Sequence, residues 1–157
     1  MRNYKYKLNW CLKNENRMKK ITPNYKLSDE HLEKAKHNLK AADFNIRGGF
    51  DDWAVSQLYY AMYHSLLAIL FKKGFESKNH ECTINTIEYL IEKGEIDFDK
   101  EDMAFIRTTE QMTKKDAKSL REEFQYGTKT KVNKILLDEL IKKSKEIVEK
   151  VEVMLLG

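Results

Sequence analysis

The longest apolar stretch of the chain is Trp53–Phe71, nineteen residues without Asp, Glu, Lys or Arg. An apolar run of this length is also typical of a membrane span. Ser56, Gln57 and His64 lie within it, however, and polar groups there would each be costly in lipid. We therefore expect no membrane contact. Because the stretch is apolar nearly all round, it predicts a helix that is covered nearly all round by protein.

Residues at the two ends of this stretch indicate where the helix begins and ends. Asp51 or Asp52 can cap its start, and a carboxylate also suits the positive end of the helix dipole. Gly74 follows two lysines and supplies a C-terminal stop. The apolar helix is thus expected to end just before Gly74.

Four further segments repeat apolar residues at three- and four-residue spacing, which is typical of helices with one buried face. They are Ser28–Arg47, His80–Lys93, a segment from near Asp99 to Gly127, and Thr130–Leu156. Ser28 is expected to be the N-cap of the first helix, with two acidic residues in the first turn. Gly48-Gly49 ends that helix directly before the apolar one, so the two should form an antiparallel hairpin.

This pattern predicts an all-α fold, an up-and-down helical bundle of four to five helices over residues 28–156. Residues 1–22 are expected to form a short basic N-terminal arm or helix. The chain has only one proline and six glycines, which are few for a turn-rich β fold. In no segment do apolar and polar residues alternate as they do in a strand. A chain of 157 residues suits one domain with a substantial core.

The first 20 residues combine basic and aromatic side chains. Seven Lys or Arg residues stand against one acid, Glu15, and Tyr4, Tyr6 and Trp10 are interleaved with them. Such a segment can hold nucleic acid through phosphate contacts and base stacking. The alternative, which we favour, is a short helix or arm packed on the domain or on a second subunit.

Composition narrows the chemistry only a little. The net charge of +4 permits binding to RNA or phosphates without requiring it. The basic N-terminus lacks the apolar region of a signal peptide. The chain has only two cysteines, Cys11 and Cys82, and they are far apart in the sequence. We therefore expect two reduced thiols in a cytoplasmic protein rather than a disulfide or a metal pair. The four histidines show no metal-ligand spacing and no cofactor motif is present, so we expect no metal and no cofactor.

Two stretches follow motifs of a known family. Residues 54–64 read Ala-Val-Ser-Gln-Leu-Tyr-Tyr-Ala-Met-Tyr-His, and residues 121–127 read Arg-Glu-Glu-Phe-Gln-Tyr-Gly. The first resembles the second-helix pattern of the HEPN domain family (higher-eukaryote and prokaryote nucleotide-binding), in which a small residue leads to Tyr-Tyr-Ala-Met-aromatic-His. The second is similar to an Arg-x-x-x-x-Tyr-Gly pattern in one branch of that family. The resemblance covers about Ser28–Leu156 and includes the order of the helices.

The resemblance implies a four- or five-helix bundle that usually forms a homodimer and contacts nucleotides or RNA. Many members of the family are metal-independent ribonucleases that use an Arg-x(4–6)-His motif. Many are encoded beside a small nucleotidyltransferase, in toxin–antitoxin-like pairs. In this chain no arginine is followed by a histidine at that spacing, and Arg121 is followed at the corresponding position by Tyr126.

That substitution changes the chemistry expected of the site. RNA cleavage through the 2′-hydroxyl needs a base near pH 7 and a cation for the charge on phosphorus. Arg121 can supply the cation, but a tyrosine has an ordinary pKa of about 10, so Tyr126 is a poor base. His64 or His80 is a conceivable base from elsewhere. The candidate catalytic residues are therefore Arg121, Tyr126 and His64.

The candidate binding residues for RNA or a nucleotide are Arg121, Tyr126, Tyr60 and His64. Tyr60 and His64 lie four residues apart on one helical face, which makes them the best pair to line a shared pocket. The structural alternatives are a surface ion pair for Arg121 and core packing with satisfied polar tips for the tyrosines and His64.

Three functions follow, and they stay open at this point. The leading hypothesis is a HEPN-type module that binds RNA or nucleotides as a homodimer and works with a nucleotidyltransferase partner in a toxin–antitoxin-like pair. The second is a metal-independent endoribonuclease toxin with an atypical Arg/Tyr site. The third is a structural helical adaptor.

Overall fold

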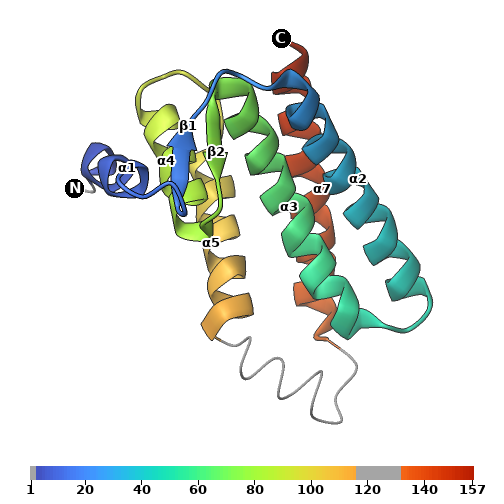
Figure 1. Ribbon diagram of the computed structural model, residues 1–157. Helices are drawn as coiled ribbons and strands as arrows, with labels where there is room; N and C mark the ends of the chain where they lie inside the picture. Colours follow the sequence, from blue (N-terminus) through green and yellow to red (C-terminus); the bar gives the residue numbers. More distant parts are fainter. Residues whose placement is uncertain (1–2, 116–131) are drawn as a thin grey trace.

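The computed structural model describes residues 3–115 and 132–157, which form a helical bundle with one small sheet (Figure 1). Its elements are α1 (Tyr4–Leu12), β1 (Met18–Lys20), α2 (Tyr25–Arg47), α3 (Asp51–Lys73), β2 (Phe75–Ser77), α4 (His80–Glu92), α5 (Lys100–Lys115) and α7 (Lys134–Leu156). The fold is all-α, as predicted. The expected stop at Gly127 and start at Thr130 lie outside the described residues.

Helix α3 is the centre of the bundle. It packs against α2, α7, α4 and α5, and α2 runs antiparallel beside it along most of its length (Figure 1). By length and composition α3 could cross a membrane, but 78% of its most apolar window is buried in the bundle. Its largest fully buried side chains include Leu58, Tyr59, Met62, Leu66, Ile69 and Leu70. This burial is that of the core helix of a bundle, as the charge-free sequence predicts.

The caps differ in detail from the predicted ones. Helix α2 begins one turn early, at Tyr25, because the Asn24 side chain accepts a hydrogen bond from the backbone N–H of Leu27 at 3.0 Å. Ser28 is therefore not the N-cap; it is buried, and its Oγ donates to the carbonyl of Ala68 at 2.7 Å. The hydroxyl of a serine between two packed helices can form its hydrogen bond with a backbone carbonyl of the facing helix as well as with a helix N-terminus.

The ends of α3 are set by backbone geometry more than by side-chain caps. Phe50 occupies the N-cap position without a side-chain hydrogen bond, and Asp51 and Asp52 lie in the first turn. Gly74 ends the helix in the left-handed conformation with φ 91°, as predicted. A Cβ at Gly74 would also meet the carbonyl oxygen of Ile21 at 2.8 Å, so no other residue fits there.

The small sheet was not predicted. β1 pairs antiparallel with β2, with Met18 opposite Ser77 and Lys20 opposite Phe75. Three-residue strands are too short for alternation to be visible in the sequence. The pairing ties the N-terminal segment to the loop between α3 and α4.

Cys11 and Cys82 form a disulfide between α1 and α4, so the expectation of two reduced thiols is wrong. Both residues are fully buried, and their Cα atoms are 5.8 Å apart. Two buried cysteines 71 residues apart meet only because the chain returns β2 and α4 to the N-terminal segment, which spacing alone does not reveal. The basic N-terminal segment is thus a helix packed on the domain, the alternative that we favoured from the sequence.

Helices α5 and α7 are joined by a buried carboxylate. Asp102 is fully buried and accepts hydrogen bonds from Lys150 Nζ at 2.5 Å and Lys143 Nζ at 3.5 Å. A buried acid is tolerated where cations and hydrogen bonds neutralise it. Asp102 therefore links α7 to α5.

We predict that reduction of the disulfide destabilises the fold. A cross-link that closes a loop of this length contributes about 2–4 kcal/mol, mainly by restricting the unfolded chain. Dithiothreitol should lower the free energy of unfolding in urea by that amount, and a Cys11→Ser/Cys82→Ser variant should show the same loss without further response to dithiothreitol. An unfolding curve that dithiothreitol leaves unchanged in the wild type would contradict the cross-link.

Candidate functional site

Over Trp53–Phe71, helix α3 has one open stripe on an otherwise buried surface. From Trp53 to His64 the side chains that are not buried are Trp53, Ser56, Gln57, Tyr60 and His64. Four of these, at spacings of four, three and four residues, lie on one helical face. Trp53 is 53% exposed and Tyr60 45%. Within Trp53–Phe71, the stripe is the part of the central helix that a ligand or partner can reach.

His80 joins the middle of the stripe to α4. It is the first residue of α4, whose N-cap is Asn79. Its ring stacks on Tyr63 with the centroids 4.0 Å apart, and its Nδ1 lies 3.0 Å from the hydroxyl of Tyr59. Tyr60 meets the same ring edge-on at 6.3 Å between centroids. Tyr60 is thus the exposed member of a packed aromatic cluster.

The two buried tyrosines of this cluster are neutral hydrogen-bonding groups. Burial raises the pKa of Tyr59 and Tyr63, and the charge of Glu110 raises the pKa of Tyr59 further. The Tyr63 hydroxyl lies 3.1 Å from Oγ1 of Thr83, which donates in turn to Ser77 Oγ at 2.7 Å. These hydroxyl contacts fix the start of α4 against α3, so the support of Tyr60 is rigid.

A pair of histidines closes the other end of the stripe. His31 on α2 and His64 on α3 stack with their Nδ1 atoms 2.9 Å apart, and His31 also stacks on Phe71. Burial lowers the pKa of His64 to about 4, with help from the neighbouring His31, Lys34 and His80. Burial lowers the pKa of His31 as well. Both rings are therefore neutral at pH 7, which allows one Nδ1–H to donate to the other Nδ1.

Arg107 joins α5 to α4, the helix that carries His80. Its guanidinium on α5 pairs with Glu88, with Glu81 at 3.2 Å and with the amide oxygen of Asn85 at 2.8 Å, all on α4. A pocket of about 450 Å³ lies beside it, between α1, α4 and α5. The three partners hold α4, and with it His80, in a fixed position relative to α5.

A model of the HEPN domain family matches residues 28–154. The chain belongs to the HEPN domain family. No match was found among curated protein sequences. The HEPN domain spans α2 to α7 and contains the open stripe of α3, whereas α1 and β1 precede it. Membership of this family indicates a function related to nucleotides or RNA.

The structure describes two of the four predicted binding residues. Tyr60 and His64 lie on the open stripe of the HEPN domain, and the ring of Tyr63 lies between them, 6.5 Å from Tyr60 and 6.3 Å from His64 between centroids. Arg121 and Tyr126 lie outside the described residues, so their place beside this pair stays a prediction.

Two features of the site were missed from the sequence. The first is the His31–His64 pair, which the hairpin geometry could have revealed: His31 lies 17 residues before Gly48, and His64 lies 15 residues after Gly49. The second is the position of His80 over Tyr63. This position depends on the β1–β2 pairing and on the N-cap at Asn79. The sequence of a short loop predicts neither of them.

We predict that His64 makes the HEPN domain less stable as the pH falls. Its pKa is lower in the folded state than in the unfolded chain, so between pH 6.5 and 4 the unfolded state takes up a proton that the folded state does not. The free energy of unfolding of the wild type should therefore fall faster over this window than that of a His64→Gln variant. Urea unfolding at pH 7, 6, 5 and 4 measures this, and parallel curves for the two proteins would show that His64 titrates normally.

Proposed function

We propose that this HEPN domain binds RNA or a nucleotide at the open stripe of α3, with Tyr60 and His64 facing the ligand and Arg121 and Tyr126 completing the site. The observation that carries the proposal is the exposed ring of Tyr60, set on a rigid cluster of Tyr63 and His80 inside the family-matched region. An exposed aromatic ring on a fixed support is the element that nucleic-acid sites use to stack a base.

The polar groups around Tyr60 suit the rest of a nucleotide. His64 and His31 place ring nitrogens at the α2 side of the stripe, and Lys34 lies near enough to influence His64. A neutral imidazole can donate a hydrogen bond to phosphate or to a base edge. Arg121 would add a planar guanidinium, whose paired donors fit phosphate oxygens better than an ammonium does.

A metal-independent endoribonuclease is the second candidate function. His64 favours it because a base must be unprotonated, and the lowered pKa of His64 keeps its ring neutral at pH 7. Arg121 would stabilise the charge that develops on phosphorus, and Tyr126 would donate a hydrogen bond. A pKa of about 4 makes His64 a weak base, so binding without cleavage is our first choice.

The domain is further proposed to act as a homodimer. Three exposed aromatic side chains, Phe44, Phe50 and Trp53, lie around the turn between α2 and α3, and exposed Ile135 begins α7 at the same end of the bundle (Figure 1). Exposed apolar groups gathered at one end of a domain are typical of protein interfaces. A symmetric dimer through this end would leave Tyr60 and His64 accessible beside it.

The partner and compartment complete the proposal. We propose that the domain works with a small nucleotidyltransferase in a toxin–antitoxin-like pair in the cytoplasm. Co-expression with a nucleotidyltransferase encoded beside it, followed by gel filtration, tests the pairing: co-elution supports it and separate peaks oppose it. A domain that binds neither RNA, nucleotide nor such a partner would be the structural adaptor.

We predict that Tyr60→Ala weakens RNA binding about 5- to 150-fold, because stacking of one base on an aromatic ring contributes about 1–3 kcal/mol. Arg121→Ala should also weaken binding, and Arg121→Lys should restore part of it. Fluorescence anisotropy with labelled RNA at one fixed salt concentration measures the affinities, and thermal melting checks the fold.

The matched controls are Tyr25→Ala, an exposed tyrosine on α2, and Arg47→Ala, an exposed arginine. If Tyr60→Ala and Arg121→Ala both bind RNA and nucleotides as the wild type does, the proposed site is wrong. Cleavage of RNA in EDTA that disappears in Arg121→Ala would select the ribonuclease over the binding module.

Light scattering should give about twice the monomer mass of 18.6 kDa at micromolar concentration. Trp53→Asp should shift the mass to that of the monomer, because a carboxylate would be buried in the interface. Tyr25→Asp is the control at an exposed aromatic away from that end. A wild-type monomer, or a Trp53→Asp variant that stays dimeric, would contradict the proposed interface.

A further inference from the structure

The charge of the protein is concentrated in the segment before the HEPN domain. Residues 1–22 hold seven of the 29 basic residues and one of the 25 acidic residues. The remaining chain therefore carries 22 basic and 24 acidic residues, a net charge of −2. The whole excess of +4 comes from a segment that lies outside the family match at 28–154.

Residues 3–22 of this segment are attached to the domain. The side chain of Asn3 caps α1 by accepting from Tyr6 N at 3.0 Å, and Leu8 and Cys11 are buried against the domain. The disulfide from Cys11 to Cys82 and the β1–β2 pairing attach the segment to the domain at residue 11 and at residues 18–20. The inner face of α1 thus holds the helix in place, and its outer face has a defined orientation.

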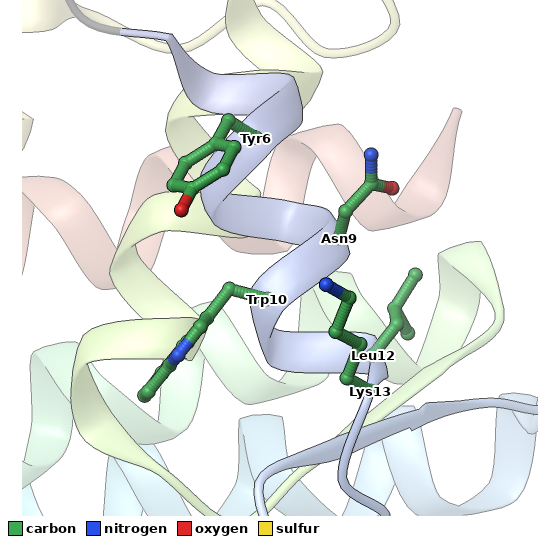
Figure 2. Close-up of a pocket in the computed structure, with 5 residues that line it drawn as sticks. All are labelled: Tyr6, Asn9, Trp10, Leu12 and Lys13. Atoms are coloured by element: carbon green, nitrogen blue, oxygen red, sulfur yellow. The ribbon is translucent and has the colours of Figure 1, made fainter.

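The outer face of α1 carries large aromatic rings. Tyr6 is 69% exposed and Trp10 is 45% exposed, and the two lie four residues apart. Figure 2 shows their rings one turn apart on the same side of the helix. Together with Asn9, Leu12 and Lys13 they line a pocket of about 430 Å³. Two large exposed rings that lie next to each other and line a pocket are typical of a binding surface.

Cations lie beside these rings. The Arg17 guanidinium lies 3.6 Å from the centroid of the Trp10 ring, and its Nη1 donates to the Trp10 carbonyl at 2.9 Å. This contact fixes the indole and places a positive charge next to it. Lys5 and Lys13 are exposed, and their spacing from Tyr6 and Trp10 puts a basic row alongside the aromatic row.

We propose that the outer face of α1 binds single-stranded RNA, with bases stacked on Tyr6 and Trp10 and phosphates contacting Lys5 and Lys13. Unpaired bases are needed because bases inside a duplex do not present their faces to a protein ring. The positive charge suits a polyanion, and the aromatic row distinguishes this surface from a purely basic patch. The inference rests on the proposed RNA binding of the domain and adds a second contact, which would extend the site along one strand.

The test uses a fluorescein-labelled 20-nucleotide uridine oligonucleotide and the full chain. Tyr6→Ala/Trp10→Ala should weaken binding by about tenfold or more. Lys5→Gln/Lys13→Gln leaves the packing of α1 intact and should reduce the slope of log affinity against log salt by about 1.4, because each phosphate contact on a single strand contributes about 0.7. Lys142→Gln/Lys145→Gln, two exposed lysines on α7, is the charge-matched control and should leave the slope unchanged.

Tryptophan fluorescence reports the stacking directly. The chain has two tryptophans, so Trp53→Phe, which keeps an aromatic ring at position 53, leaves Trp10 as the sole tryptophan, and the anisotropy midpoint of this variant is compared with that of the wild type. The oligonucleotide should quench its fluorescence with the same midpoint as the anisotropy. Absence of quenching, together with wild-type affinity in Lys5→Gln/Lys13→Gln, would overturn the proposal and leave this face to an acidic protein partner.

The two RNA proposals fail separately. Loss of affinity in the α1 variants but not in Tyr60→Ala or Arg121→Ala would support binding on α1 and reject the site on α3. The reverse result would reject binding on α1 and support the site on α3.

Discussion

The burial of α3 is the constraint on which the structure depends. A helix without charged residues over nineteen positions must be covered on every side, and α2, α4, α5 and α7 are arranged around it to do so. The cover is incomplete along one line, from Trp53 to His64. Because the rest of the Trp53–Phe71 stretch is buried, a ligand that contacts this stretch has to do so through that line. The same packing that stabilises the fold therefore selects the residues that are available for binding.

Supports on neighbouring helices turn this line into an ordered site. Asn79 begins α4 at the position that stacks His80 on Tyr63, and Arg107 holds α4 against α5 through three partners. On the other side the hairpin with α2 sets His31 against His64. Each support buries polar atoms that are paired with one another, so removal of one partner would leave the other buried without a hydrogen bond.

The sequence predicted the helices well because their signals are long and repeated. The apolar stretch of α3, the stop at Gly74 and the hairpin at Gly48-Gly49 each follow from local patterns, and the family motif in residues 54–64 pointed to Tyr60 and His64. Contacts between distant segments could not be predicted in this way. The Cys11–Cys82 disulfide and the His80–Tyr63 stack depend on a three-residue strand pair. The prediction of Ser28 as the N-cap of α2 was wrong because a serine hydroxyl can also donate to a carbonyl of a facing helix, here that of Ala68.

The disulfide between Cys11 and Cys82 bears both on the compartment in which the protein works and on the position of α1. Disulfides are rare in the cytosol of most cells, but they are common in the intracellular proteins of hyperthermophiles, whose proteins are also rich in Lys and Glu. Without a covalent link, α1 would be held on the domain only by the packing of its inner face, through Leu8 and Cys11, and by the β1–β2 pairing that follows it. The disulfide restricts the movement of α1 further and keeps Tyr6 and Trp10 in one orientation on the surface. A stacking surface needs this order, because rings that must first be ordered bind a base less tightly.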